Sequence, residues 1–346
     1  MFSQLDITKF RGIAEGRIAG LTNVSVIVGP NNSGKSSCLE AIEIACSAPT
    51  IADILSLAQR RGGRPHAAAR HLIYGDAKET SIVLSGETTR SMKFSERATY
   101  IDGELTMALE EGLVQPIGLY RATLTVTRAS QHVSTAGLVG AMDASGKHAV
   151  PTIETGRKAP HPSALVDVNL VRGPRAMETA YSEIDRTGRL DAVVTALRAS
   201  MSSLTDLRIL ESEGDFVLHA FLEGGARVPA YLFGDGFKRL LELAAALAQQ
   251  SGAIVLLEEP ECFQHPRYQI EFVRLLQHAA ARGVQIVLST HSLELLDRIL
   301  HAEWPDDAPH PSVHRLRLVG GQLACTSLNR REAVAARDEI AEDLRT

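Results

Sequence analysis

The sequence predicts an α/β fold with a mixed, largely parallel sheet, and three features carry this prediction. A β-branched run at 24–28 passes through a glycine-containing loop into a helical pattern that begins at Gly34. A strand–helix–strand pattern occupies 253–290, and such a unit is expected to pair its strands in parallel through a right-handed crossover. Short alternating runs between residues 80 and 128 indicate an antiparallel layer.

The predicted elements follow one another as their apolar patterns indicate. Alternation over 2–10 predicts a first strand, and the helix after the glycine loop aligns Leu39, Ile42 and Cys46 on one stripe. The segment 137–163 is rich in Gly, Pro, Ala and Ser and is expected to be a long mobile loop. The other predicted elements are helices near 175–203 and 236–250, a strand at 253–257, a helix from Pro266 to Gly283, a buried strand at 284–290, a surface loop at 303–312 and a final helix from about Arg331.

The composition is that of a soluble globular protein, since 45% of the 346 residues are apolar and 22% are charged. The four cysteines lack CxxC spacing, so we expect reduced thiols and no metal held by cysteine. No apolar run approaches the roughly 20 residues that cross a bilayer, and no secretory pattern opens the chain. We therefore expect a cytoplasmic location without membrane contact.

The net charge of −5 argues against a surface that coats nucleic acid, although a local basic face would still allow DNA binding. The segment 59–71 gathers four arginines with glycines. It is a candidate contact for a phosphate backbone or a partner, and the alternative is a solvated basic loop.

A phosphate-binding loop is indicated by “GPNNSGKSS”, which matches the pattern GxxxxGK[ST] between a predicted strand and a predicted helix. In such loops a glycine lets the backbone approach the phosphates, Lys35 brings a positive charge to the β and γ phosphates, and Ser36 can hold Mg²⁺. We therefore expect ATP and Mg²⁺ as ligands, and the alternative is a glycine turn with an unrelated lysine. The candidate nucleotide-binding residues are Gly29, Pro30, Asn31, Asn32, Ser33, Gly34, Lys35, Ser36 and Ser37.

Two adjacent glutamates, Glu258 and Glu259, end the apolar strand in “IVLLEEPE”. In ATPases with a phosphate loop, a neighbouring strand ends in a carboxylate that positions Mg²⁺, and a second carboxylate can activate the attacking water. Because successive side chains of a strand point to opposite faces, Glu258 is expected to serve the metal with Ser36, and Glu259 is expected to be the base. The alternative is an acidic turn at the exit of a buried strand.

The next predicted strand ends in “STHS”, which contains His291. An imidazole at the tip of the strand beside the carboxylate strand can reach the γ-phosphate or hold the attacking water. We therefore take His291, with Lys35 and Glu259, as the candidate catalytic residues. The alternative is a histidine that only packs.

In this order, “GPNNSGKSS”, “LLEEPE” and “STHS” resemble the motifs of ABC-class ATPases, in particular the non-transporter branch. That branch contains the overcoming-lysogenization-defect (OLD) ATPases, RecF-type recombination ATPases and the heads of chromosome-maintenance (SMC) proteins. The start “LDITKFRGI”, with Phe10 and Arg11, and “HP” at 265–266 resemble the same branch. The resemblance covers 1–48 and 165–300, and it places Arg11 among the nucleotide-binding residues.

The resemblance implies a P-loop NTPase fold of the ABC head type, as one domain over residues 1–346. We expect it to comprise an N-terminal antiparallel β layer with the phosphate loop at 1–136, a mobile loop at 137–163, a helical signature lobe at 164–250, and a part at 251–346 that holds the carboxylate strand, the histidine strand and a C-terminal helix.

The resemblance also implies that two protomers sandwich two ATP molecules, each completing the other's site with a signature loop. The candidate loop is “YLFGDGFKRLL” at 231–241, where Asp235 stands at the serine position of the LSGGQ signature. An aspartate facing a triphosphate would be repelled, so we expect its side chain to cap a helix beginning at Gly236. The Gly236 N–H, Lys238 or Arg239 would then contact the phosphate in trans. The alternative is a simple helix start.

The sequence thus favours an ATP-hydrolysing homodimer, with a higher oligomer left open. Most members of the class have aspartate where Glu258 stands, which predicts a weaker Mg²⁺ site or slow turnover. OLD nucleases carry a Toprim nuclease domain after the ATPase, and the residues that follow His291 are too few for one. The leading hypothesis is therefore a stand-alone ATPase that controls a separately encoded effector, such as a nuclease or toxin, in anti-phage defence. The alternatives are a RecF-like or SMC-like DNA-binding ATPase in repair or recombination, and a scaffold that binds ATP without hydrolysing it.

Overall fold

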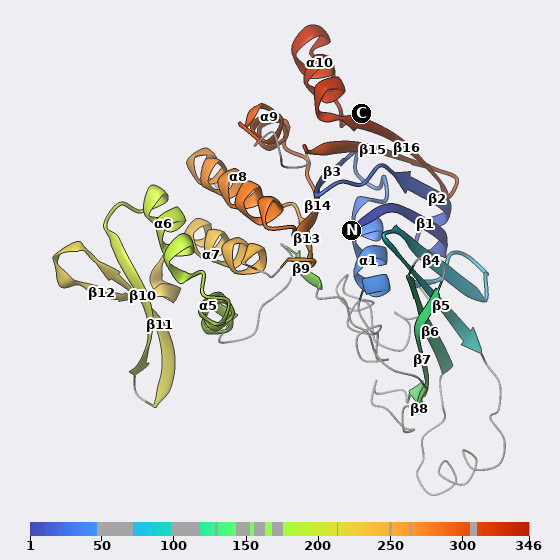
Figure 1. Cartoon of the computed structure of the whole chain (residues 1–346), viewed down its shortest axis with the longest axis horizontal. Helices are drawn as coiled ribbons and strands as arrows, with labels where there is room; N and C mark the ends of the chain where they lie inside the picture. Colours follow the sequence, from blue (N-terminus) through green and yellow to red (C-terminus); the bar gives the residue numbers. More distant parts are fainter. Residues whose placement is uncertain are drawn as a thin grey trace, which may run out of the picture. The chain divides into compact units, whose positions relative to one another are not determined.

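The structure is a computed structural model, and its chain forms two compact units that are treated separately (Figure 1). The first unit comprises Met1–Leu21, Pro30–Pro162 and Leu316–Ser327, and the second comprises Thr22–Gly29, Ser163–Arg315 and Leu328–Thr346. The residues that the structure describes are 1–46, 72–97, 118–128, 131–142, 153–155, 163–167, 176–212, 214–248, 251–262, 265–304 and 310–345.

The first unit is built on strands that are mostly antiparallel. In hydrogen-bonding order they are β8 (Ile153–Thr155), β7 (Gln131–Met142), β6 (Gly118–Arg128), β5 (Thr88–Arg97), β4 (Glu79–Gly86), β1 (Phe2–Phe10), β2 (Ile13–Ala19) and β16 (Gln322–Asn329), the last of which is parallel to β2. Alternation along β1 buries Phe2, Leu5, Ile7 and Phe10. Helix α1 (Lys35–Cys46) packs on β1, β4 and β5, and it closes the core of this unit.

The second unit is a parallel sheet with helices. Its strands are β15 (Ser312–Val319), β3 (Val24–Val28), β14 (Gln285–Ser289), β13 (Ile254–Glu258) and β9 (Ser163–Asp167), in that order. Only the Ser312–Arg315 part of β15 belongs to this unit, and that part pairs with β3. Every residue of β3 and β14 is buried, as expected for strands covered on both faces. Its helices are α5 (Ala176–Arg186), α6 (Leu190–Ser200), α7 (Asp235–Leu247), α8 (Pro266–Ala281), α9 (Leu293–His301) and α10 (Arg330–Ile340).

The register of these parallel strands brings three strand ends to one edge. Glu258 of β13 pairs with Ser289 of β14, and Ser289 pairs with Ile27 of β3. The carboxyl ends of parallel strands therefore line up here, which is where α/β proteins place ligands. The chain continues from the end of β3 directly into the glycine-containing loop.

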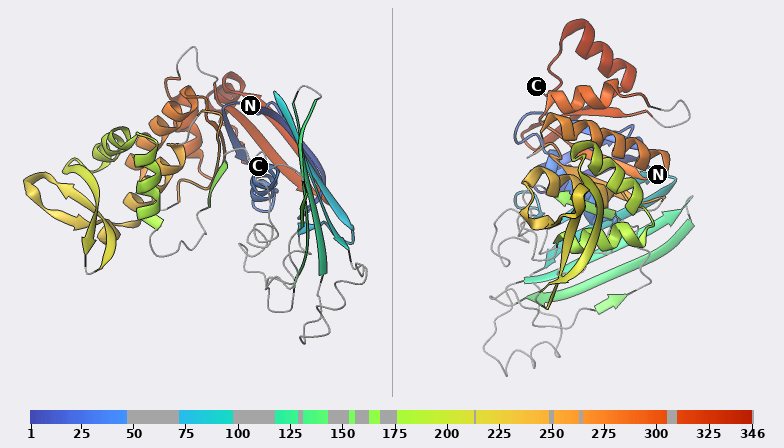
Figure 2. Two further views of the ribbon diagram at one scale, coloured as in Figure 1. Left: turned by 60° about the horizontal axis from the view of Figure 1, so that its bottom comes forward. Right: turned by 90° about the vertical axis from the view of Figure 1, so that its left-hand side faces the viewer.

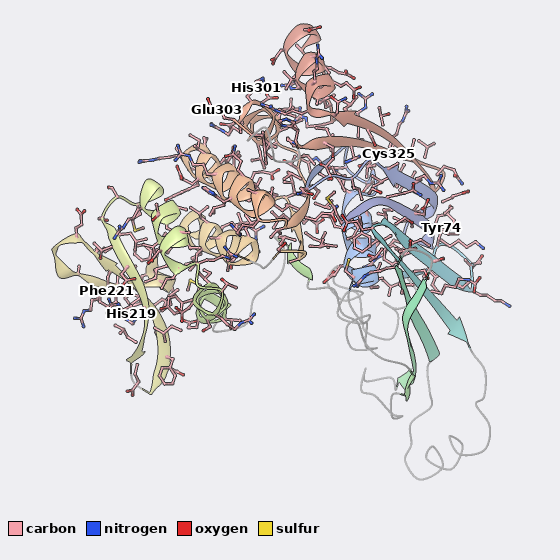
Figure 3. All side chains as sticks on the ribbon, viewed as in Figure 1. Tyr74, His219, Phe221, His301, Glu303 and Cys325 are labelled. Carbon is pink, nitrogen blue, oxygen red and sulfur yellow. The ribbon has the colours of Figure 1, made fainter. Side chains whose placement is uncertain are left out.

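A separate three-stranded antiparallel sheet belongs to the second unit and lies beside α5 and α6 (Figure 2). Its strands are β10 (Leu204–Ser212), β11 (Asp215–Leu222) and β12 (Arg227–Pro229), followed by the short 3₁₀ turn η3 (Ala230–Leu232). Figure 3 marks Phe221 on β11. Two guanidinium groups lie over its ring, that of Arg208 at 5.2 Å and that of Arg227 at 5.3 Å from the ring centroid. This sheet lies in the segment that the sequence predicts to be a helical lobe.

The predicted mobile loop at 137–163 is partly wrong. Residues 137–142 continue β7, residues 153–155 form β8, and β9 begins at Ser163. The physical reason is that β7 pairs with β6 along its whole length, so its backbone groups find partners despite the small side chains. The remaining residues of that segment lie outside the described ranges, as do all of 59–71.

The predicted surface loop at 303–312 is also partly wrong. Trp304 is 6% exposed, and its indole Nε1 donates to the carbonyl oxygen of Ile299, while Ser312 begins β15. Residues 305–309 lie outside the described ranges. The helices predicted near 236–250, from Pro266 and from about Arg331 are found within a few residues of these positions. Among the residues that the structure describes, no helix is both long and apolar enough to span a membrane.

Candidate nucleotide-binding site

The loop between β3 and α1 is shaped by its backbone. Asn32 and Gly34 have positive φ angles of 63° and 93°, and the N–H of Ser33 donates to the carbonyl oxygen of Pro30 over 3.3 Å. Helix α1 then begins at Lys35 with no acidic side chain in its first turn. A helix N-terminus without a carboxylate carries a partial positive charge, so the loop and helix together suit an anion such as a phosphate group.

Gly34 is required where it stands for two reasons. Its φ of 93° is strained for any residue with a side chain. A Cβ atom there would also lie 3.3 Å from Cδ1 of Leu323 and 3.5 Å from Cδ1 of Ile13. The glycine therefore holds the close turn that brings the loop onto α1.

Two polar groups of this loop are buried. Lys35 is 6% exposed, and its Nζ donates to the carbonyl oxygen of Pro30 over 2.8 Å, so the ammonium group is held over the loop. Ser33 is 2% exposed, and its Oγ has no hydrogen-bond partner among the described residues. Pro30, Asn31 and Asn32 are exposed, whereas Ser36 and Ser37 are half-buried. A buried ammonium and an unpartnered hydroxyl around a glycine turn fit a bound phosphate.

Arg11 belongs to the same unit and contacts α1. Its Nε lies 2.9 Å from Oε2 of Glu40, and these side chains are 10% and 4% exposed. Its backbone N–H donates to the carbonyl oxygen of Leu72 over 2.9 Å. Arg11 therefore ties the turn after β1 to the helix that follows the loop, and a contact of Arg11 with nucleotide stays a prediction.

The second group of candidate residues lies at the carboxyl ends of β13 and β14. Oε1 of Glu259 lies 3.4 Å from Nε2 of His291, and about a third of each side chain is exposed. The thiol of Cys262 is 3.5 Å from Oε2 of Glu259. Burial, followed by the charges of Glu261 and Glu259, raises the pKa of Cys262 to about 11, so the thiol stays protonated and donates to the carboxylate. The structure thus brings Glu259 and His291 together.

The backbone of Glu259 is strained. Its φ is 44°, in the left-handed region, which costs a non-glycine residue about 1–2 kcal/mol. The N–H of Glu259 donates to the carbonyl oxygen of Ser289 over 3.0 Å, which extends the pairing of β13 with β14 by one residue. This bond holds Glu259 in a conformation that turns the chain just beyond Glu258.

Glu261 is a functional candidate that the sequence analysis missed. Its Oε1 accepts from Oγ1 of Thr290 over 2.6 Å and from the N–H of His291 over 3.1 Å. Its Oε2 is buried and has no hydrogen-bond partner among the described residues. The signal available in the sequence was the third glutamate of “EEPE”. Glu261 fixes the backbone that carries His291.

Two arginines also contact backbone carbonyl oxygens at these strand ends. Arg239 of α7 is 6% exposed, and its Nη2 lies 3.4 Å from the carbonyl oxygen of Glu258. Arg345 donates from Nη1 to the carbonyl oxygen of His291 over 3.1 Å, and its pairing with Asp343 lowers the pKa of that carboxyl group to about 2. Arg239 therefore contacts a strand end of its own chain. Gly236 and Lys238 remain the candidates for a contact with the nucleotide of a second copy.

The predicted cap by Asp235 is wrong. Helix α7 begins at Asp235, its N-cap is Gly234 in an extended conformation, and no side chain caps it. Asp235 is exposed and pairs instead with Lys238, with 3.6 Å between Oδ1 and Nζ. The physical reason is that the helix starts one residue earlier than predicted. The Asp235 carboxylate then sits within the first turn, where it still interacts favourably with the helix dipole.

The candidate residues therefore fall into two groups, each within one unit. The loop residues 30–37 and Arg11 belong to the first unit, and Glu258, Glu259, Glu261 and His291 belong to the second. No group of three or more His, Cys, Asp or Glu side chains that could hold a metal ion by itself occurs in the part of the chain that the structure describes. Mg²⁺ is commonly held by one or two carboxylates with substrate phosphates. Because Ser36 and Glu258 belong to different units, a magnesium site that uses both stays a prediction.

Comparison with known proteins gives partial sequence matches. Residues 156–297 match a family described as “AAA domain, putative AbiEii toxin, Type IV TA system”. A stretch of 73 residues is 38% identical to a “Putative ABC transporter ATP-binding protein” of Methanosarcina acetivorans and covers 21% of this chain and 26% of that protein. A stretch of 68 residues is 35% identical to “Uncharacterized protein MJECL11” of Methanocaldococcus jannaschii and covers 19% of this chain and 60% of that protein. The chain thus matches less than two thirds of the length of both relatives.

Solved structures match over almost the whole chain. The Smc head bound to the C-terminal winged-helix domain of ScpA is 13% identical, with a TM-score of 0.54, and the match covers 96% of this chain and 99% of that chain. The Smc head with an extended coiled coil, bound to the C-terminal domain of ScpA derived from Pyrococcus furiosus, is 11% identical, with a TM-score of 0.50 and 99% of both chains covered. At such identities the likeness concerns the fold. The predicted α/β fold class is confirmed, and the chain has the fold of these Smc heads.

Proposed function

We propose that this protein binds ATP with Mg²⁺, hydrolyses it, and dimerises around it to control a separately encoded effector. The observation that carries the proposal is the shared edge of three parallel strands. The chain continues from β3 into the loop with Lys35, and β14 and β13 follow β3 in the sheet order. Just beyond the ends of β13 and β14, Oε1 of Glu259 lies 3.4 Å from Nε2 of His291. Transfer of a phosphoryl group to water requires groups that hold the phosphates and a group that positions or activates the water. A phosphate-binding loop, a carboxylate and an imidazole can supply these functions.

Each candidate residue has a role in this proposal. The loop amides and Lys35 neutralise the phosphates, and Ser36 and Glu258 hold the metal. Bound Mg²⁺ would neutralise charge that develops on the phosphate oxygens. Glu259 accepts the proton of the attacking water, and His291 orients that water or the γ-phosphate. Gly236 and Lys238 of a second copy complete the site, which makes the ATP-bound form a homodimer.

An effector is proposed because the matched family description names a toxin and a toxin–antitoxin system. A nuclease or toxin encoded separately, acting in anti-phage defence, suits an ATPase of this kind. The alternative function is an ATP-dependent DNA clamp. Binding of duplex DNA that strengthens with ATP and falls steeply with salt would favour the clamp.

The proposal is tested first by replacing Lys35. Lys35→Ala is expected to weaken ATP binding by about 10–100-fold, because it removes a charge-assisted contact to phosphate. Binding is measured with a fluorescent ATP analogue, and hydrolysis by phosphate release. Lys78→Ala, at an exposed lysine of the same unit, is the matched control and should bind as the parent does. ATP binding that survives Lys35→Ala unchanged would remove the loop from the site. ATP binding without phosphate release by the parent, with or without DNA, would leave only the scaffold role.

Glu261 is expected to position His291. Glu261→Ala leaves Oγ1 of Thr290 and the N–H of His291 without their acceptor, and we expect the kcat for ATP to fall about tenfold or more, with KM little changed. Glu261→Gln keeps an acceptor oxygen and should retain most of the activity. Phosphate release at several ATP concentrations separates kcat from KM. Equal kcat values for Glu261→Ala and the parent would show that Glu261 only fills space.

A further inference from the structure

Helices α6, α7 and α8 pack against one another (Figure 1). Their side chains line an open pocket of about 500 Å³. Its floor is apolar and includes Val193, Ala244, Leu247 and Leu275, all buried in the core of the second unit. Ala192, Ala196 and Ala248 also line it, and their small side chains leave space between the helices. The pocket lies within one unit and contains none of the candidate nucleotide-binding residues.

The rim of this pocket is charged. Arg189, Arg274, Arg282 and His278 line it, together with Asp191 and Glu271. Arg274 pairs with Glu271, with 2.7 Å between Nη1 and Oε1, so these two charges offset each other. Among the described residues of the rim, this leaves the charges of Arg189 and Arg282 and the opposite charge of Asp191. These residues carry an excess of positive charge on a protein whose net charge is −5.

Arg282 shows that this positive charge is not fully compensated. Its Nη1 and Nη2 donate to the carbonyl oxygens of His278 and Leu247, over 2.8 and 2.6 Å. Its Nε is buried and has no hydrogen-bond partner among the described residues. Burial, and then the nearby charge of Arg189, lowers the pKa of Arg282 to about 10. Two guanidinium groups that repel each other beside an apolar floor would be stabilised by an anion.

We propose that this pocket receives an apolar side chain of a protein partner, with an adjacent carboxylate of that partner pairing with Arg189 and Arg282. The volume suits one large side chain and its flanking backbone, since ligand pockets of about 300–1,000 Å³ are usual. At protein interfaces, the residues that contribute most to the binding energy are commonly side chains buried in such a pocket and surrounded by other contacts that exclude water. Nε of Arg189 donates to the carbonyl oxygen of Ala248, and each Nη atom of the two arginines carries two N–H groups. A carboxylate can accept from the N–H groups that remain and offset the charge of both guanidinium groups.

A partner bound in the pocket would be coupled to the proposed nucleotide site through helix α7. Helix α7 begins at the signature loop and ends at the pocket with Leu247, about 20 Å away along the helix axis. Arg239 of the same helix contacts the carbonyl oxygen of Glu258. A partner in the pocket therefore contacts the helix that braces the carboxylate strand. This coupling rests on the proposed function, whereas binding to the pocket does not.

The experiment uses two probes that differ in one group, the dipeptides acetyl-Trp-Asp-amide and acetyl-Trp-Asn-amide. Their affinities for the full chain are measured by calorimetry or by ligand-observed NMR. The aspartate probe is expected to bind about tenfold more tightly, because only it carries the carboxylate. Equal affinity of the two probes, or binding of neither, would overturn the proposal. Acetate or inorganic phosphate binding as tightly as the aspartate probe would instead assign a site for free anions and overturn the peptide partner.

Variants locate the binding. Arg282→Gln and Arg189→Gln should each remove most of the preference for the aspartate probe. Arg282 also donates a hydrogen bond to the carbonyl oxygen of Leu247 at the end of α7, so its replacement can destabilise the fold. Arg189→Gln then provides the test if Arg282→Gln does not fold. Ala192→Trp, at an exposed position on the rim, should block both probes. Arg267→Gln, at the far end of α8, is the matched control and should bind both probes as the parent does. A preference that survives both pocket arginine variants would exclude this site.

Repeating the measurement with Lys35→Ala separates the two proposals. This variant should bind the probes like the parent, because Lys35 lies in the other unit. If ATP binding fails in the parent while the probe preference holds, the pocket stands without the proposed ATPase. If ATP is hydrolysed and the probes do not bind, the ATPase stands without the pocket.

Discussion

Glutamine in place of Glu259 is expected to lower phosphate release by about 10²–10⁴-fold while ATP binding persists, the usual range for loss of a general base. The glutamine side chain has nearly the same size as glutamate but cannot accept the proton of water. It also removes the charge that faces Nε2 of His291 at 3.4 Å. Because hydrolysis is what reopens the proposed dimer, the variant should accumulate as an ATP-bound dimer. Single-turnover hydrolysis and light scattering with ATP measure both effects.

Glu294→Gln is the matched control for this experiment. Glu294 lies on α9, a short way beyond His291, and is about half exposed. It pairs with Arg298 of the same helix, so the same chemical change there should leave hydrolysis unaltered. Glu259→Gln protein that hydrolyses ATP at the normal rate would remove Glu259 from the role of base. Loss of ATP binding in this variant would assign Glu259 to binding instead.

The free energy of unfolding is expected to fall by about 3 kcal/mol between pH 6.5 and pH 4 on account of His314 alone. His314 is fully buried, and this burial lowers its pKa from 6.5 to about 4. Between these values the unfolded chain binds a proton at His314 and the folded chain does not. The contribution is therefore complete above the unfolded pKa and is lost as the pH falls toward the folded value.

The surroundings of His314 favour the neutral ring. Its Nε2 lies 2.9 Å from Oγ of Ser312, which in turn lies 3.3 Å from Oγ of Ser25 and 3.1 Å from Oγ1 of Thr22. These hydroxyl groups offer no charge to offset an imidazolium between β15 and β3.

Urea unfolding of the parent and of His314→Asn at several pH values isolates this effect from the other titrating groups. The variant should lose less stability over the acidic range, so its free energy of unfolding minus that of the parent should rise as the pH falls below about 6.5. Replacing His301, an exposed histidine whose pKa is raised by its hydrogen bond to Asp338, is the control, and it should not reproduce this difference. Parallel curves for parent and His314→Asn would contradict the prediction.

Local sequence patterns predicted the helices and strands that depend mainly on the residues within them. Strands β1 and β3, helix α8 and the helix after the phosphate loop follow from apolar periodicity, from the proline at the start of α8 and from the glycines of the loop. Strands β10, β11 and β12 lie in the segment that the sequence predicts to be a helical lobe, although Leu207 and Ile209 alternate on β10. Each strand finds its hydrogen-bond partners in its neighbours, and a local pattern does not specify such pairing. The sequence does not predict the extension of β7 into the glycine-rich segment, because small residues have a low strand propensity. The strand forms there because β6 supplies hydrogen-bond partners for its backbone.

The sequence by itself determined the class of the fold, the glycine-containing turn between β3 and α1, and the positions of Glu258, Glu259 and His291 at or just beyond strand ends, because each depends on neighbours within a few residues. Only the tertiary structure decided which groups fix those side chains. Glu261 bonds to the N–H of His291 across 30 residues, and Arg345 bonds to its carbonyl oxygen across 54. The pocket beside α7 likewise requires three helices to pack. Contacts between distant residues depend on the packing of the whole unit, and a local pattern does not carry that information.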